Sequence, residues 1–181
     1  MSSPRVKVLV PHLIQRKISS EILTMVTAYD STFASIVDEA GVDLILVGDS
    51  VATVLQGQKT TLGVSMEQME YHVQMVASVK PRALIVGDLP FGSYHGSSGE
   101  ALRSSIRIMK ESGGHAVKLD GGIEIIDSFK RILTAGIPVM GHLGLTPQSI
   151  YKFGTNVVRA KEENEAQRLI EDAKALEEAG C

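Results

Sequence analysis

Short apolar runs alternate with longer stretches of helical spacing along the chain. The apolar runs, which we predict to be β-strands, cover residues 22–28, 44–47, 81–86, 115–119 and 137–140. The predicted helices cover residues 31–40, 65–79, 100–112, 123–135 and 163–179. Unbroken apolar runs are typical of buried parallel strands, and their alternation with helices predicts an α/β fold. The polar, glycine-containing connection at 51–64 is long enough to indicate a functional or mobile loop, and residues 92–99 are predicted to form another loop.

The junctions between helices and strands repeat one pattern. A helical stretch ends at glycine, an apolar run follows, and a polar residue closes it, as after Gly41 and again after Gly136. Glycine ends helices because it adopts the left-handed C-cap conformation without a steric penalty. A further repeat begins at Gly180, and the sequence stops one residue later at Cys181. We therefore expect the chain to lack the strand that should come next.

Two architectures are compatible with this pattern. One is an open, doubly wound sheet of five strands, which would be complete in the 181 residues. The other is an incomplete (β/α)8 barrel, because eight such units need about 250 residues. Five predicted strands would then leave roughly three of the eight outside the chain. In either case we expect residues 1–181 to form a single domain, since no linker or low-complexity tract interrupts them.

Composition narrows the classes of protein that are possible. The chain is 44% hydrophobic but only 4% aromatic, with no Trp, so an aliphatic core is expected. The net charge of -3 gives no reason to expect nucleic acid or an anionic membrane as a partner. A single Cys excludes an intramolecular disulfide and fits a cytoplasmic protein. No apolar stretch reaches the roughly 18 residues of a membrane span.

The first twenty residues are basic and carry no acid, which leaves two interpretations. A transit peptide is one of them. The other, which we favour, is an N-terminal helix that lies across the domain, because strand-like sequence follows directly after it.

Three aspartates, Asp49, Asp88 and Asp120, stand at the carboxyl ends of predicted strands. These ends meet on one face of a parallel sheet, so we expect the three carboxylates to lie together. Carboxylates crowded in this way repel one another, and oxygen ligands of this kind favour Mg²⁺ or a similar hard cation. The alternative is that each aspartate caps the helix that follows it.

Two further side chains could act in the same place. Lys118 lies two residues before Asp120, so both point to one side of the strand while Val117 and Leu119 point to the helical layer. A lysine on the inner side needs an anion, which could be a substrate carboxylate or one of the aspartates. His142 could donate a hydrogen bond to substrate or be held by the backbone.

Five segments, in this order and spacing, resemble the ketopantoate hydroxymethyltransferase family. They are Thr27-Ala28-Tyr29-Asp30, Val47-Gly48-Asp49-Ser50, Asp88-Leu89-Pro90-Phe91, Val117-Lys118-Leu119-Asp120-Gly121-Gly122 and Gly141-His142-Leu143-Gly144-Leu145-Thr146-Pro147-Gln148. The resemblance covers the chain from about Val8 to its end. It implies a (β/α)8 barrel, with about five of the eight strands in this chain, and assembly as a homo-oligomer, often a decamer.

The resemblance also implies roles for individual residues. Asp49, Asp88 and Asp120 would be at the Mg²⁺ site, and Asp49, Ser50, Asp88 and Lys118 would bind the 2-oxo acid. The family usually has Glu in place of Asp120, and the shorter side chain leaves room for a water between carboxylate and metal. The family also commonly has glycine in place of Ala52 and histidine in place of Gln58.

The implied reaction transfers a hydroxymethyl group from 5,10-methylenetetrahydrofolate to 3-methyl-2-oxobutanoate and gives ketopantoate, in pantothenate biosynthesis. It proceeds through an enolate that Mg²⁺ stabilises. In the family the base is a Glu at the end of the sixth strand, which would lie just beyond Cys181, so no catalytic base is expected in this chain.

Two other functions are alternatives to this one. One is a related barrel lyase or phosphomutase, which would be expected to lack the Gly141–Gln148 segment. The other is a non-catalytic module that binds a 2-oxo acid or a metal. An open barrel would expose strand edges, so we expect poor folding of the 181 residues alone.

Overall fold

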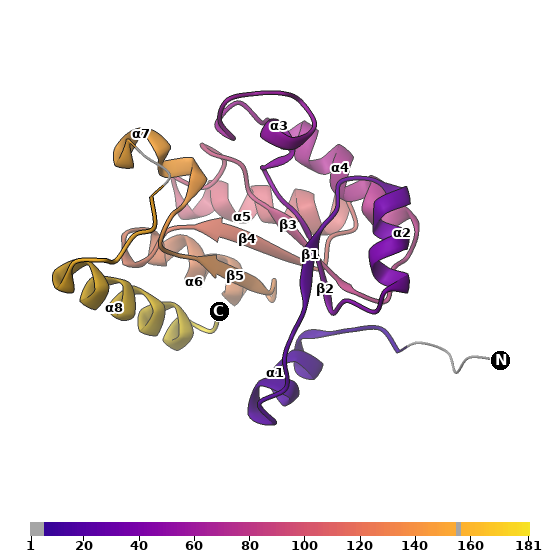
Figure 1. Ribbon diagram of the computed structural model, residues 1–181, viewed down its shortest axis with the longest axis horizontal. Coiled ribbons are helices and arrows are strands. Elements are labelled where there is room, and N and C mark those ends of the chain that lie inside the picture. Colours follow the sequence, from indigo (N-terminus) through magenta and orange to yellow (C-terminus); the bar gives the residue numbers. More distant parts are fainter. Residues whose placement is uncertain (1–5, 155–156) are drawn as a thin grey trace.

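The computed structural model describes residues 6–154 and 157–181, in which five strands form one parallel sheet (Figure 1). The strands are β1 (Met25–Thr27), β2 (Leu44–Val47), β3 (Leu84–Asp88), β4 (Ala116–Asp120) and β5 (Val139–His142). They lie side by side in sequence order, and each neighbouring pair is parallel. A doubly wound sheet reverses its order at a switch point, whereas a barrel does not. The open doubly wound alternative is therefore wrong, and the sheet is part of a barrel wall.

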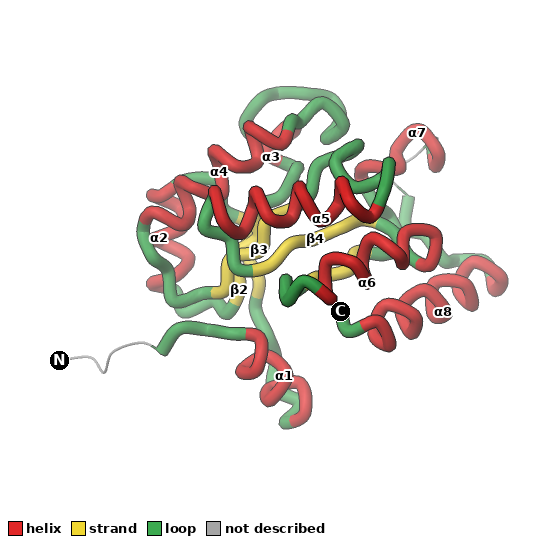
Figure 2. The backbone as a smooth tube through the Cα atoms, turned by 180° about the vertical axis from the view of Figure 1, so that it is seen from behind, coloured by secondary structure: helices red, strands yellow, loops and turns green. Residues whose placement is uncertain are grey.

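Helices cover the outer face of this sheet (Figure 2). They are α2 (Ser31–Glu39), α4 (Met66–Ser78), α5 (Ser98–Ile106), α6 (Ile126–Thr134) and α8 (Glu163–Ala179). Ile45, Ile85 and Val117 point outward from the strands and pack with helix side chains such as Val73 and Ile132 in one buried cluster. None of the helices in the described ranges is both long and apolar enough to cross a membrane.

The inner face of the sheet changes from apolar to polar along the strands. Leu84, Val86 and Ala116 lie near the amino ends and form a second, smaller apolar cluster. Two residues further along β4 come Lys118 and then Asp120, on the same side of the strand. Val117 and Leu119 belong to the helix-facing cluster, as predicted. On the inner face of β4, the two-residue alternation therefore places the charged side chains toward the carboxyl end of the strand.

The N-terminal segment closes the amino end of the sheet. Helix α1 (Val10–Ile18) packs its Val10 and Leu13 against the inner apolar cluster. Before it, Val8 N donates to Arg82 O at 2.8 Å, and Lys7 Nζ donates to Pro81 O at 2.6 Å. The prediction of a helix across the domain is confirmed for this segment.

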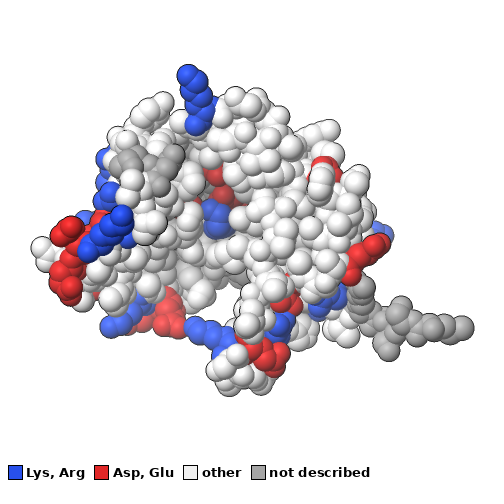
Figure 3. Space-filling view, in the orientation of Figure 1, with Lys and Arg blue, Asp and Glu red and all other residues white. Residues whose placement is uncertain are grey.

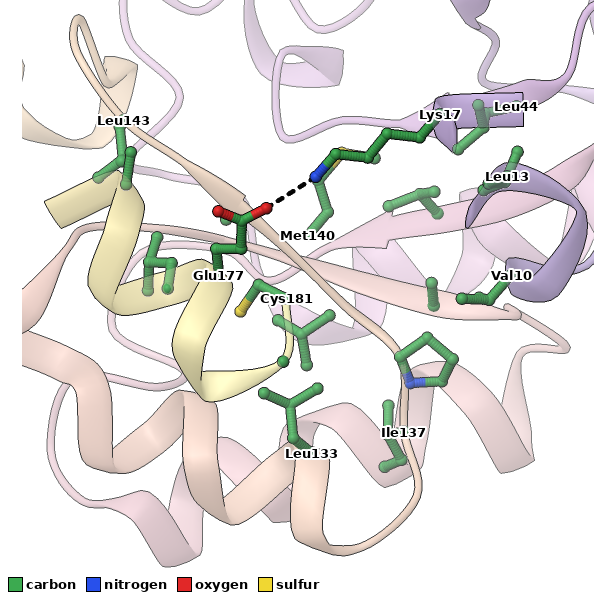
Figure 4. Close-up of a pocket in the computed structure, with 18 of the residues that line it drawn as sticks. Val10, Leu13, Lys17, Leu44, Leu133, Ile137, Met140, Leu143, Glu177 and Cys181 are labelled. Carbon is green, nitrogen blue, oxygen red and sulfur yellow. Dashed lines mark hydrogen bonds and ion pairs between the residues drawn. The ribbon is translucent and has the colours of Figure 1, made fainter. Parts of the chain in front are cut away.

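An apolar cavity of about 850 Å³ lies between α1, the inner face of the sheet and the ends of α6 and α8 (Figure 4). Leu44 and Met140 line it from the sheet side and Leu13 from α1, and Lys17 Nζ pairs with Glu177 across it at 2.8 Å. β5 is the edge strand beside this cavity. A closed barrel has no edge strands, so a sixth strand of such a barrel would lie here, against β5.

Several predicted boundaries are wrong at the strand ends. β3 and β4 extend through Asp88 and Asp120, which pair in register with Lys118 and His142, so these aspartates end the strands instead of following them. β5 begins and ends two residues later than predicted, and β1 is shorter at both ends. Apolar periodicity misses such positions because the ladder continues through polar residues whose backbone groups remain paired.

Two helical predictions also need correction. The predicted loop at 51–64 begins with a short helix, α3 (Val51–Val54), whose Val51 is fully buried. The predicted helix at 100–112 is α5 followed by a π-helical turn at Arg107–Glu111. Two short helical segments, Ile123–Ile125 and Pro147–Ser149, precede α6 and α7 (Ile150–Phe153).

His115 provides a test of the packing between β3 and β4. Its ring Nδ1 accepts a hydrogen bond from Ile85 N at 2.9 Å, which requires that nitrogen to be unprotonated. Burial, with a smaller contribution from the charge of Lys7, lowers the pKa of His115 from 6.5 to about 4. Between these values the unfolded chain binds a proton that the folded chain does not, so the free energy of unfolding should fall as the pH drops from 6.5 to 4.

We predict that His115→Asn, which keeps an acceptor near Ile85 N, shows a smaller fall over that range than the unmodified protein. Urea unfolding at pH 7 and pH 5 measures the difference. Equal pH dependence in both proteins would contradict the assignment.

Candidate active site

The charged cluster is built from the carboxyl ends of three adjacent strands. Asp49 follows β2, Asp88 ends β3 and Asp120 ends β4, and their exposed fractions are 5%, 2% and 7%. Asp49 N donates to Asp88 Oδ2 at 3.3 Å, which joins the first two positions directly. The structure therefore brings together the three aspartates singled out from the sequence. They do not cap helices, whereas Asp30 does, by accepting a hydrogen bond from Phe33 N.

Lys118 lies between two of these aspartates. Its Nζ is 2.8 Å from Asp88 Oδ1 and 2.9 Å from Asp120 Oδ1, and the residue is only 7% exposed. The internal ion pair considered from the sequence is thus present, and it involves two carboxylates. Three carboxylates and one ammonium leave a net charge of about -2 when all are ionised.

Burial and the neighbouring charged groups together shift the pKa values of these residues in different directions. Desolvation raises the pKa of Asp88 to about 7 and also raises that of Asp49. Burial opposes the ionisation of Asp120 too, but the hydrogen bond from His142 and the charge of Lys118 outweigh it and lower its pKa. Desolvation disfavours the charged form of Lys118, yet Asp88 and Asp120 hold its pKa above the usual value. Asp88 is thus the carboxylate that most lacks compensation.

The chemistry of this cluster fits a divalent cation, although the side chains are not already arranged around one. Within the described ranges, no three His, Cys, Asp or Glu side chains are placed as a set of metal ligands. However, Asp88 Oδ1 is buried and meets Lys118 only as an ion pair, without a hydrogen bond of normal geometry. All the donors are carboxylate oxygens, and a charge of +2 would neutralise the excess.

Two other residues from the sequence analysis lie at the border of the cluster. His142 ends β5, and its Nδ1 contacts Asp120 Oδ1 at 2.8 Å. Ser50 follows Asp49, and its hydroxyl contacts Tyr29 Oη at 2.8 Å instead of an aspartate. His142 therefore belongs to the charged cluster, and Ser50 lies beside it.

Two residues that reach this cluster, Gln148 and Tyr94, have no role predicted from the sequence. Gln148 Nε2 donates to Asp49 Oδ2 at 3.0 Å. Tyr94 Oη accepts from Asp120 N at 3.1 Å. Gln148 lies within the last of the five recognised segments, which was the only signal for it. Tyr94 stands in a loop of glycine and serine, where no periodicity marks a buried position.

The cluster lies beside a cavity of about 920 Å³. Asp120 and His142 border it, together with Phe91 and His95 from the loop after β3 and Phe153 from α7. Figure 3 shows a hollow near the centre of one face, with acidic and basic residues at its bottom and uncharged residues around its rim. A small molecule could therefore reach the charged groups from the carboxyl end of the sheet, where barrel enzymes bind their substrates.

Solved structures confirm the type of fold. A 2,3-dimethylmalate lyase, described as a member of the PEP mutase/isocitrate lyase superfamily, has a TM-score of 0.66 at 16% identity and covers 98% of this chain and 62% of its own. A phosphonopyruvate hydrolase complex with oxalate and Mg²⁺ has a TM-score of 0.68 at 13% identity, over 94% of this chain and 60% of its own. Likeness at this level of identity shows the fold alone, a partial (β/α)8 barrel.

Sequence comparison is more specific. A family model described as ketopantoate hydroxymethyltransferase matches residues 7–181. The 3-methyl-2-oxobutanoate hydroxymethyltransferase of Flavobacterium johnsoniae is 64% identical over 169 residues, which cover 93% of this chain and 62% of the relative. That of Cytophaga hutchinsonii is 62% identical over 175 residues, 97% of this chain and 64% of the relative. This chain spans less than two thirds of the length of these relatives, and it belongs to the ketopantoate hydroxymethyltransferase family.

Proposed function

We propose that the protein containing this chain transfers a hydroxymethyl group from 5,10-methylenetetrahydrofolate to 3-methyl-2-oxobutanoate and forms ketopantoate, a precursor of pantothenate. The observation that carries the proposal is the buried cluster of Asp49, Asp88, Asp120 and Lys118 in a chain of this family. A site that is rich in carboxylates suits a cation that binds a 2-oxo acid. A cytoplasmic homo-oligomer is the setting we propose, as in the resemblance described above.

Asp49, Asp88 and Asp120 would hold Mg²⁺ at the carboxyl ends of β2, β3 and β4. When bound, the cation supplies the Lewis acidity that makes the C3 proton of the 2-oxo acid easier to remove. The raised pKa of Asp88, about 7, means that this carboxylate carries a proton for part of the time at neutral pH. Cation binding must displace that proton, so affinity should increase as the pH rises through 7.

Lys118 would bind the carboxylate of the 2-oxo acid. Its Nζ is shared between Asp88 and Asp120, at 2.8 and 2.9 Å. Asp88 and Asp120 would hold this ammonium less tightly if they also shared their charge with a bound cation. Nζ would then have a donor available for the substrate carboxylate, with Ser50 at the border of the site as a second contact.

The proton acceptor for C3 is proposed to be a glutamate in the sixth strand, outside the 181 residues. The folate would bind in the cavity beside Asp120 and His142. Phe91 and Phe153, which line this cavity, offer flat aromatic surfaces for a planar ring. The complete reaction is therefore a property to be tested in the full-length protein.

We predict that Asp88→Asn in the full-length protein lowers the rate of ketopantoate formation at least about 100-fold, because it removes a charged ligand that no neighbour replaces. The same variant should slow the Mg²⁺-dependent exchange of the C3 hydrogen of 3-methyl-2-oxobutanoate in D₂O, which needs no folate. Proton NMR follows both reactions.

The matched control is Asp30→Asn, the same chemical change at a helix N-cap where asparagine is equally suitable. This variant should retain both reactions. An Asp88→Asn protein that keeps full activity, or unmodified protein that shows neither reaction with Mg²⁺, would contradict the proposed function.

A second prediction concerns the charge of Lys118. Lys118→Met should lower the free energy of unfolding by about 3 kcal/mol at pH 8, because it leaves buried carboxylates without their cation. The loss should be smaller at pH 6, where the carboxylates can take up protons, and smaller again when Mg²⁺ is added. Urea unfolding with and without Mg²⁺ measures these differences.

Lys17→Met is the control for this second prediction, because its ion pair with Glu177 is largely exposed, at 73% and 69% for the two side chains. It should change the free energy of unfolding by less than about 1 kcal/mol. If Lys118→Met has as small an effect at pH 8, the buried ion pairs do not support the site.

A further inference from the structure

Gln148 is a buried amide that makes three hydrogen bonds, one of them to an aspartate of the charged cluster. Its Nε2 donates to Asp49 Oδ2 at 3.0 Å and to Leu89 O at 3.0 Å, and its Oε1 lies 2.7 Å from Tyr94 Oη. Leu89 O can only accept, so the amide nitrogen must face it and the amide oxygen must face the tyrosine. The side chain is 5% exposed, so water does not compete for these bonds.

Tyr94 continues the same chain of hydrogen bonds to the other side of the cluster. It is fully buried, and its Oη accepts from Asp120 N at 3.1 Å while donating to Gln148 Oε1 at 2.7 Å, with Asp120 O as a second, more distant acceptor at 3.1 Å. The amide oxygen of Gln148 can only accept, so the phenol must be the donor in this hydrogen bond.

These contacts connect the first and third aspartates of the cluster through two neutral side chains. The order is Asp49, Gln148, Tyr94 and the backbone of Asp120, and the residues come from the ends of β2 and β4, the 92–99 loop and the turn after β5. We propose that Tyr94 and Gln148 are positioning residues that hold Asp49 at a fixed place relative to Asp120 and so pre-arrange the cation site. This inference rests on the proposed function.

The need for such a bridge follows from the charge of the cluster. Lys118 forms its close ion pairs with Asp88 and Asp120, whereas Asp49 accepts a hydrogen bond from the neutral amide of Gln148. Asp49 is 5% exposed, and apart from the more distant charge of Lys118 it needs a hydrogen-bond donor of its own to hold its carboxylate in place before a cation arrives. An amide donor restrains it without adding positive charge, whereas a lysine or arginine in that place would compete with the cation.

A role in stability alone is the alternative, because any buried polar network can stabilise a fold. The two roles differ in what they predict for cation affinity. Residues that orient metal ligands typically change affinity by about 10–100-fold when replaced. A residue that only stabilises the fold leaves the affinity of the folded protein unchanged.

The experiment compares three variants of the full-length protein, Tyr94→Phe, Gln148→Met and the double variant, with Mn²⁺ as the probe. Electron paramagnetic resonance titration gives the Mn²⁺ dissociation constant, and thermal unfolding is followed in parallel. We expect each single variant to weaken Mn²⁺ binding about tenfold, and the double variant to be no weaker than the poorer single one, because the two residues act as one bridge.

Ser105→Ala is the matched control, since it removes a buried hydroxyl that donates to Ala101 O at 2.8 Å within α5, away from the bridge. It should leave Mn²⁺ affinity unchanged, whatever its effect on the unfolding temperature. Unchanged Mn²⁺ affinity in both single variants, or losses that simply add in the double variant, would overturn the inference while leaving the proposed function intact. If the unmodified protein binds no Mn²⁺, the proposed function fails and the inference fails with it.

Discussion

The structure depends on burying three carboxylates and one ammonium at the same edge of a parallel sheet. Charges of this kind are costly to remove from water unless they are paired and hydrogen-bonded. The sheet meets this constraint by placing Lys118 between Asp88 and Asp120, and by supporting the cluster with His142 and Gln148. The charge that remains uncompensated is the feature that makes the cluster suitable for a cation.

The rest of the fold packs around that edge of the sheet and holds the strands in place. Outward-facing residues of the strands pack under the helices, and Gly87 leaves room there, because a Cβ in its place would lie 2.6 Å from Ile108 Cγ2. Inward-facing residues are apolar near the amino ends, where α1 covers them. The large apolar cavity beside β5 shows how much of the inner surface a closed barrel would still have to cover.

Much of this arrangement could be predicted because it depends on local pattern. Buried parallel strands appear in the sequence as apolar runs. The two-residue alternation of a strand places Lys118 and Asp120 on one side of β4, as the structure confirms. The residues at which strands end were harder to predict from the sequence. Asp88 and His142 continue the ladder, since backbone pairing does not depend on side-chain polarity. The short helix after Ser50 was missed because it is one turn long and glycine-containing sequence follows it.

The sequence by itself determined the class of fold, the family and the identity of the acidic residues, because each depends on residue type and spacing along the chain. Only the tertiary structure decided which partners those residues have. Lys118 could have paired with one aspartate or none, and it contacts two. The link from Asp49 through Gln148 to Tyr94 joins positions that are 99 and 54 residues apart. No local pattern encodes such contacts, because they arise only when the strand ends converge and water is excluded.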